Sequence, residues 1–485
     1  MAESGAGKRV VRKIGSSHVV WFPESNRWVE FQEPAWLIYQ GVGKGEDDVV
    51  TTAALAKKYG LPEKEARRFY REVSRAIKES EISPAPVTAN PEEESEPDEE
   101  PDRNGRLAKT PATKPDPAHP GPHPSHKLRT LRTRTRHYRA NNRHFTITFG
   151  SPLAEYYIHR PLAHLETDNG STTGPGTTKP GTTKPGTNEP GMTDPGTTGP
   201  GTPEAGALCL YLDAENKGKR CYAEVTLPGA GSPAAYHFDD PGFLKHRAYT
   251  EICNHIHGTG NGEWMCYIHA SAVTDGHRAV LLPSASGSGK STMAALLQLP
   301  ADETTAPGSG PPTPHSTETG TGSQSAKNNK NADLQLWFMS DDFIPVSASN
   351  LKAYPFPAAI AVKEGSYDVV APWYDQRSDA DAGYRVPGRK PVRYLRPRFP
   401  GRDPFGPRPV TAMVFLKYDA EANFSMEMMD TLRALEAFHR EAWVSQNPAH
   451  AEKFIDWFVN VSCYRLTFSN SQQAAGAIKN LFGNR

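Results

Sequence analysis

The sequence has few of the features that mark secreted, membrane-spanning or nucleic-acid-binding proteins. Only five of its 485 residues are cysteine and none forms a CxxC pair, so we expect reduced thiols rather than disulfides or a zinc site. It has neither an apolar run of about 18 residues nor an apolar signal core in residues 1–5, so we expect no membrane-spanning helix and no secretory signal. The 55 basic residues equal the 55 acidic ones, which gives no argument for binding nucleic acid or a membrane. We therefore expect a cytoplasmic protein with neither as a partner.

Apolar residues are scarce as well. They make up 36% of the chain, and the mean hydropathy is −0.63, which is low for a chain that packs throughout its length. We expect a disordered linker over residues 81–139, because its first part is Pro-rich and acidic. The basic run at 127–143 is either a solvated linker end or an arm for acidic groups. Two disordered insertions are expected at about 171–204, where Gly-Thr-Thr-Lys-Pro repeats, and at about 301–333.

Residues 8–80 predict a small α+β domain. Two β-prone runs at 18–22 and 27–31 are separated by Pro-Glu-Ser-Asn and predict a hairpin. Helices are expected at about 34–42, 49–59 and 62–80. The last of these has Pro in its first turn and apolar residues at spacings of three and four, which form one apolar face.

The region 140–484 alternates strand-like and helix-like patterns, which favours an α/β fold with a central sheet flanked by helices. The strands expected are 145–149, 208–212, 266–270, 278–282, 335–340, 411–417 and 463–468. The helices expected are 289–299, 426–440, 448–458 and 470–482.

The strongest motif is Ser-Ala-Ser-Gly-Ser-Gly-Lys-Ser-Thr at 284–292. It follows an apolar strand pattern and precedes a helical one, which is the setting of a phosphate-binding P-loop. The residues predicted to bind ATP are Ser286, Gly287, Ser288, Gly289, Lys290, Ser291 and Thr292. The glycines let backbone N–H groups face a phosphate, Lys290 reaches the β- and γ-phosphates, and Ser291 can ligate Mg²⁺. Ser284 stands where the usual motif has its first glycine.

An apolar strand pattern that ends in Asp341 and Asp342 follows the loop in the sequence. A carboxylate at this position can hold Mg²⁺, and a second one can act as general base. The sequence therefore predicts Ser291, Asp341 and Asp342 as metal-holding residues, with both acids also as catalytic residues. Which acid has which role stays open.

His269 is the third candidate catalytic residue beside Lys290 and the two acids. Asp275-Gly276 is a strong turn signal, and a two-residue turn there places His269 opposite Leu282, one step before the phosphate loop. A shift of one residue would turn the imidazole to the other face of the sheet. A purely structural histidine is the alternative.

These three motifs, with Tyr-Ile-His-Ala at 267–270, resemble the catalytic domain of HPr kinase/phosphorylase-like proteins in order and context. The resemblance implies a P-loop kinase related in fold to phosphoenolpyruvate carboxykinase, which uses ATP and Mg²⁺ to phosphorylate a Ser or Thr hydroxyl. Residues 361–366 also look like the HPr-kinase-related subgroup. Lys363 and the arginines of 385–408, including Arg393 and Arg396, are candidate phosphate contacts or ordinary surface residues.

The N-terminal domain resembles PqqD-like peptide-recognition domains, which have a winged-helix-type fold. The matching feature is the hairpin Val-Val-Trp-Phe/Trp-Val-Glu-Phe with the helices after it. The resemblance implies that a peptide or small protein is captured as an added strand at 18–31, with Phe22, Trp28 and the helix 62–80 lining the groove. A winged helix that binds DNA or forms a dimer is the alternative, although mixed charges on 62–80 argue against DNA.

The function we expect is therefore an ATP-dependent kinase that acts on a peptide presented by the N-terminal domain. The main alternative is a non-catalytic module in which nucleotide binding gates peptide capture, which needs no general base. A transporter-type ATPase is a third interpretation, but the sequence contains no LSGGQ-like signature to support it. The sequence leaves homo-oligomerisation open.

Overall fold

The computed structural model describes residues 9–23, 25–82, 134–167, 208–214, 221–227, 232–299, 334–371, 374, 391–401 and 403–483. These residues have a mixed α/β fold with several sheets and helices. They divide into two units, Met1–Ala108 with His257–Arg485, and Lys109–Ile256. The insertions expected at 171–204 and 301–333 lie outside the described residues. No helix in the described part is long and apolar enough to cross a membrane.

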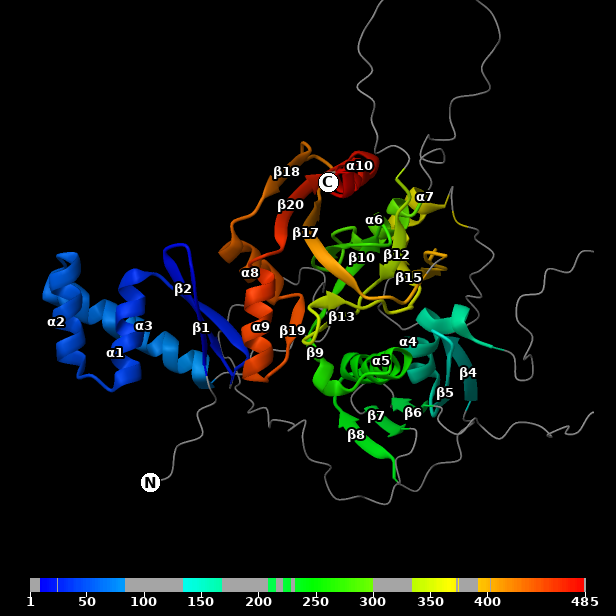
Figure 1. Cartoon of the computed structure of the whole chain (residues 1–485), viewed down its shortest axis with the longest axis horizontal. Helices are drawn as coiled ribbons and strands as arrows, with labels where there is room; N and C mark the ends of the chain where they lie inside the picture. Colours follow the sequence, from blue (N-terminus) through cyan, green and yellow to red (C-terminus); the bar gives the residue numbers. More distant parts are fainter. Residues whose placement is uncertain are drawn as a thin grey trace, which may run out of the picture. The chain divides into compact units, whose positions relative to one another are not determined.

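The N-terminal domain consists of a three-stranded antiparallel sheet and three helices (Figure 1). Its elements are β1 (Val10–Ile14), β2 (Ser17–Phe22), β3 (Arg27–Phe31), α1 (Glu33–Lys44), α2 (Asp48–Tyr59) and α3 (Glu63–Ile82). The expected hairpin is therefore β2–β3, and the three expected helices are present. Strand β1 was not expected, and it pairs with β2 along the side opposite to β3. Because β2 is the central strand, a peptide that adds a strand to the hairpin at 18–31 can pair only with the outer side of β3.

The two faces of this small sheet bury different side chains. Val20 and Phe22 pack with Ile77 of α3, whereas Val19 and Trp21 belong to a core shared with the C-terminal part of the same unit. The alternation follows from the two-residue period of a strand. Two residues expected to line a peptide groove therefore have other surroundings. Phe22 is fully buried inside the domain, and the ring of Trp28 lies 5.7 Å from that of Phe454.

The C-terminal part of this unit contains a ten-stranded mixed sheet. The hydrogen-bonded order is β12-β10-β11-β17-β14-β13-β9-β19, and β20 pairs with both β17 and β18. The strands are β9 (Trp264–Ile268), β10 (Ala270–Thr274), β11 (Ala279–Pro283), β12 (Trp337–Ser340), β13 (Ile344–Ser347), β14 (Lys352–Ala353), β17 (Arg408–Tyr418), β18 (Ser425–Met428), β19 (Ala442–Val444) and β20 (Ser462–Phe468). Strands β11, β17 and β20 are parallel to one another.

Helices cover both faces of this sheet, and the central strand β11 is accordingly apolar along its whole length. In β11, Ala279 and Leu281 face one core while Val280 and Leu282 face the other. The helices are α6 (Lys290–Leu297), α8 (Thr431–His439), α9 (Pro448–Phe458) and α10 (Ser471–Gly483). Figure 1 shows α6 and α10 with the parallel strands, and α9 beside β19. A smaller antiparallel pair, β15 (Ile360–Lys363) and β16 (Val392–Leu395), packs on α6 with α7 (Tyr367–Val370).

The second unit is built on a five-stranded sheet of order β4-β5-β6-β7-β8. Its elements are β4 (Arg134–Ala140), β5 (Arg143–Phe149), α4 (Pro152–Leu162), β6 (Leu208–Ala214), β7 (Cys221–Thr226), β8 (Ala234–Phe238) and α5 (Pro241–His257). Only the β5–β6 pair is parallel. Ser151 caps the start of helix α4, because its hydroxyl accepts a hydrogen bond from the backbone N–H of Ala154.

Several expected boundaries differ from those observed. Helix α3 continues to Ile82 and β4 begins at Arg134, so the expected linker 81–139 is folded at both ends. The region 140–484, expected as one domain, divides near residue 257. The expected helix 426–440 is wrong at its start, where β18 precedes α8. Asp430 ends the extended part and caps α8 by accepting hydrogen bonds from two backbone N–H groups of its first turn.

Candidate functional site

The sheet topology brings the three sequence motifs to one edge. Strand β10 runs antiparallel to both β11 and β12, with Ala270 opposite Pro283 and Ala272 opposite Ser340. The end of β11, the end of β12 and the start of β10 therefore meet at the same edge of the sheet. The glycine-rich loop (residues 284–289), the acidic pair and His269 continue from these strand ends, so residues far apart in sequence become neighbours.

The glycine-rich loop contains two residues in the left-handed region of backbone conformation. Gly287 has φ 85° and Gly289 has φ 93°, conformations that residues with a Cβ rarely adopt. Gly289 forms the N-cap of α6, and no side chain caps the backbone N–H groups of the first turn. These uncapped N–H groups and the positive end of the helix dipole form a site that suits an anion.

Lys290 is the most informative residue of this loop region. It is only 6% exposed, yet its ammonium group forms no hydrogen bond or ion pair with any residue that the structure describes. The hydroxyl of Ser288 is also buried without a hydrogen-bond partner within the described residues. A buried polar group without a partner, such as the Ser288 hydroxyl, is unfavourable, and a bound phosphate would accept hydrogen bonds from it and from the Lys290 ammonium. The loop therefore fits a phosphate group.

Ser284, which replaces the first glycine of the usual motif, has a structural role. Its Oγ accepts a hydrogen bond from the backbone N–H of Leu416 at 2.7 Å and donates one to the carbonyl of Pro283. The side chain is 5% exposed and joins the start of the loop to β17. The hydroxyl therefore fixes the start of the loop without entering the part formed by Gly287 and Gly289.

Asp341 is buried against the helix start. Its Oδ1 accepts hydrogen bonds from Ser271 and, at 3.1 Å, from Ser291, while Oδ2 accepts one from the backbone N–H of Ala361 at 2.9 Å. Burial, reinforced by the nearby charge of Asp342, raises the pKa of Asp341 to about 6. The Ser291 hydroxyl and this carboxylate are hard oxygen ligands, so the pair fits Mg²⁺.

Asp342 is more exposed than Asp341 and lies beside His269. It has φ 64°, an uncommon conformation for a residue other than glycine and one that is often associated with functional sites. Its side chain is 20% exposed, and its Oδ1 lies 3.5 Å from Nε2 of His269. This carboxylate is therefore accessible to a substrate group, while Asp341 is enclosed.

His269 lies between two acids. Its Nδ1 is 2.8 Å from Oε2 of Glu441, a residue that sequence analysis missed, and the imidazole is almost fully buried. Burial and the Lys290 charge act to lower the pKa of His269, but the attraction of the ring to the Asp342 and Glu441 carboxylates outweighs them, and the pKa is raised. The ring is therefore suited to carry a positive charge between Asp342 and Glu441.

The expected hairpin register around His269 is wrong. The turn contains four residues, 275–278, rather than two, and Ser271 instead of His269 lies opposite Leu282. The Asp275 carboxylate accepts hydrogen bonds from the backbone N–H groups of His277 and Arg278, which stabilises the longer turn. The register differs from the expected one by two residues, so each side chain still lies on the face of the sheet that was expected for it. His269 itself separates β9 from β10, whereas one strand over 266–270 was expected.

Of the other candidate phosphate contacts, Lys363 lies at the glycine-rich loop. Its Nζ donates a hydrogen bond to Oγ of Ser286. Arg393, on the paired strand β16, stacks its guanidinium over the Tyr367 ring at 4.2 Å. The structure gives no contact that links Arg396 to the loop.

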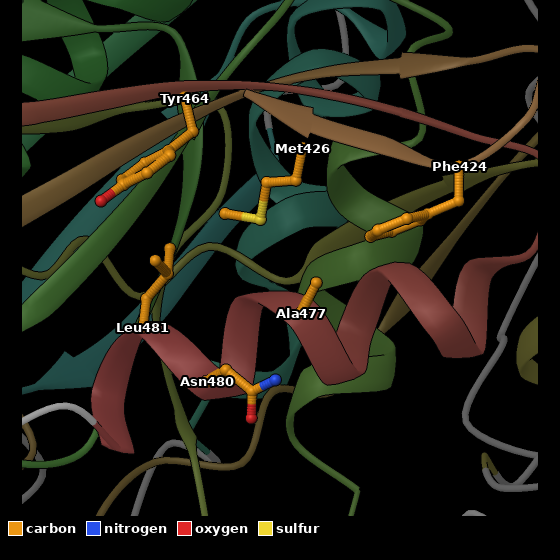
Figure 2. A pocket seen from close by; sticks show the side chains of 6 residues that line it. All are labelled: Phe424, Met426, Tyr464, Ala477, Asn480 and Leu481. Atoms are coloured by element: carbon orange, nitrogen blue, oxygen red, sulfur yellow. The ribbon is translucent and has the colours of Figure 1, made fainter. Parts of the chain in front are cut away.

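A separate hollow of about 330 Å³ lies between β18, β20 and helix α10 (Figure 2). It is lined by Phe424, Met426, Tyr464, Ala477, Asn480 and Leu481. None of these residues is a predicted site residue, so this mostly apolar hollow is distinct from the loop and the acids.

Within the described residues, no group of three or more His, Cys, Asp or Glu side chains could hold a metal ion. A magnesium ion at Ser291 and Asp341 would therefore depend on water and phosphate oxygens for its remaining ligands, as Mg²⁺ does in nucleotide sites.

Comparison with known proteins gives no assignment: no family model matches the chain, and neither a curated protein nor a solved structure is significantly similar to it.

Proposed function

We propose that this protein is an ATP- and Mg²⁺-dependent kinase of the HPr kinase/carboxykinase type that phosphorylates a Ser or Thr hydroxyl of a peptide or small protein. The observation that carries the proposal is the Lys290 ammonium, which has no hydrogen-bond or ion-pair partner among the described residues, beside the Ser291–Asp341 hydrogen bond. A cation without a partner at the start of a helix favours a phosphorylated ligand, and the acids supply the metal-holding and base functions.

The geometry supports a division of roles between the two acids. Asp341 is enclosed and hydrogen-bonded to Ser291, so in this proposal these two residues hold Mg²⁺, which neutralises phosphate charge when bound. Asp342 is partly exposed and is the general base in this proposal. It accepts the proton of the attacking hydroxyl as the new O–P bond forms to the γ-phosphate and the bond to the β–γ bridging oxygen breaks.

Lys290 and the backbone N–H groups of the loop bind and orient the phosphates, and their positive charge stabilises the transferring group. Lys363 is close enough to share this work, because its Nζ already reaches Ser286. The outer side of β3 is the place proposed for the acceptor peptide, since an edge strand has unpaired backbone groups.

The test is transfer of label from γ-labelled ATP with Mg²⁺ to arrays of Ser- and Thr-containing peptides. Arrays with Ala at those positions are the acceptor control, and Glu436→Gln, an exposed change on α8, is the protein control. We expect Lys290→Ala and Asp342→Asn to lose transfer by at least about 100-fold. Asp342→Asn should still bind ATP, because the base is not needed for binding. Undiminished transfer in both variants would refute the assignment. Tight ATP binding without labelling of any acceptor would favour the nucleotide-gated binding module.

A further inference from the structure

Glu441 is joined to His269 by two hydrogen bonds. Ala442 of β19 pairs with Ile268 of β9, so the residues just beyond these strands face each other. The backbone N–H of His269 donates to the Glu441 carbonyl at 2.7 Å, and the side chains meet at 2.8 Å between Nδ1 and Oε2. One contact fixes the backbone of His269 and the other fixes the rotation of its ring.

The other ring nitrogen of His269 is directed at the acidic pair. Nε2 is buried, has no hydrogen-bond partner among the described residues, and lies 3.5 Å from Oδ1 of Asp342. This distance is longer than a normal hydrogen bond, so a small rotation of the ring decides whether Nε2 and Asp342 come together. Whatever holds Nδ1 therefore also sets the position of Nε2.

Glu441 itself is held in place and has little other electrostatic compensation. It is 6% exposed, and its backbone N–H donates to the carbonyl of Phe438 at 2.9 Å. Within the described part of the chain, His269 is the cationic side chain that lies within 4 Å of its carboxylate. Burying a carboxylate is unfavourable unless a partner compensates it, so packing alone does not account for Glu441.

We propose that Glu441 is a positioning residue for phosphate transfer: it fixes the His269 ring so that Nε2 holds Asp342 in place as the base. This inference rests on the kinase function proposed above. Glu441 does not touch the reacting atoms in this arrangement, and it acts through His269. The order Glu441–His269–Asp342 uses the logic by which an acid orients an imidazole in other active sites.

The test compares Glu441→Ala with Glu441→Gln, and Glu436→Gln on the exposed side of α8 is the matched control. We expect Glu441→Ala to lower kcat by about 10- to 100-fold, with the KM for ATP within about twofold of the wild-type value. Glu441→Gln keeps an acceptor oxygen at the same distance, so it should recover most of the loss. A general structural defect would move KM and kcat together and would not be repaired by Gln.

A readout without activity is the ring proton on Nδ1 of His269, followed by NMR in the full-length protein without nucleotide. Because the ring is buried and hydrogen-bonded, its proton should resonate at low field and exchange slowly in the wild type. The resonance should persist, shifted, in Glu441→Gln and disappear in Glu441→Ala. If Glu441→Ala does not fold, Glu441→Gln decides alone: a shifted Nδ1 resonance with kcat close to the wild-type value supports the proposal, and an unchanged resonance refutes it.

Either of two results would overturn the inference: an unchanged Nδ1 resonance in Glu441→Ala, or a folded Glu441→Ala protein with kcat within about twofold of the wild type. Failure of the proposed function gives a different pattern. The wild type would then transfer no phosphate, while the NMR signal would still show whether Glu441 holds the His269 ring.

Discussion

Replacing Asp341 with Asn is expected to stabilise the nucleotide-free protein at neutral pH while it removes phosphate transfer. The carboxyl group is buried, and burial together with the charge of Asp342 raises its pKa from 3.8 to about 6. At neutral pH the folded protein therefore carries an ionised carboxylate in an unfavourable place. Asn has nearly the same shape and no charge, so Asp341→Asn removes this cost.

The size and sign of the effect follow from the pKa. A rise from 3.8 to about 6 corresponds to about 3 kcal/mol. The folded state binds the proton more tightly than the unfolded state, so the free energy of unfolding falls as pH rises from about 4 to about 6 and then stays lower. In Asp341→Asn the side-chain NH₂ group can take the place of the oxygen that accepts the hydrogen bond from the backbone N–H of Ala361. Two donors then face each other, which costs about 1 to 3 kcal/mol at any pH.

The measurement is urea unfolding without nucleotide or Mg²⁺ at pH 5 and pH 8. Relative to the wild type, Asp341→Asn should be more stable at pH 8 than at pH 5 by about 1 kcal/mol. Asp456→Asn is a control of opposite sign. The hydrogen bond from Arg12 lowers the pKa of Asp456, so its stabilisation is present above the unfolded pKa and is lost as pH falls. This control should lower stability at pH 8, by at most about 1 kcal/mol because the pair is exposed.

An equal difference between Asp341→Asn and the wild type at both pH values would refute the argument, since a pH-independent effect cannot come from the buried charge. ATP with Mg²⁺ adds a second comparison. The ligand should raise the melting temperature of the wild type and should raise that of Asp341→Asn less, because the variant lacks the carboxylate proposed to hold the metal.

Three further changes test the surroundings of the site. Ser284→Ala leaves the backbone N–H of Leu416 unpaired and should lower the free energy of unfolding by about 1 to 3 kcal/mol, measured by urea unfolding. Trp21→Ala empties a fully buried position and removes the hydrogen bond to Asn26, so a loss of about 3 to 5 kcal/mol is expected in the same assay. Arg12→Ala removes exposed ion pairs and should change the melting temperature little, corresponding to less than about 1 kcal/mol, most of which disappears in high salt.

Local signals in the sequence predicted the elements that carry the site. The strand before the glycine-rich loop and the helix after it are present as β11 and α6, and helix 448–458 agrees with α9. Apolar runs and Pro or Gly boundaries act over a few residues, so they can be identified without knowing the fold. The hairpin register could not be predicted in this way, because the Asp275 side chain stabilises a four-residue turn in place of the two-residue Asp-Gly turn.

Glu441 shows where sequence reasoning stops. It lies 172 residues from His269 in the chain, and it reaches the imidazole only because β19 pairs with the outer side of β9. Strand β19 has three residues, too few to give a periodic pattern. The expected helix 426–440 failed for a similar reason, since Ser425–Met428 is a strand through its pairing with β20. In both cases the pairing of strands distant in sequence determines the local structure, and a local sequence pattern does not show such pairing.

The core that Trp21 shares with the C-terminal part of its unit has a practical consequence. Val10, Val19 and Trp21 pack in the same cluster as Phe454, and Asn26 donates a hydrogen bond to the Val444 carbonyl at 2.6 Å. A fragment that began at His257 would lack Val10, Val19 and Trp21, so Phe454 and its neighbours in the cluster would face water as an apolar surface prone to aggregation. Val444 lies three residues after Glu441, so such a truncation would also remove a support of the strand beside the imidazole.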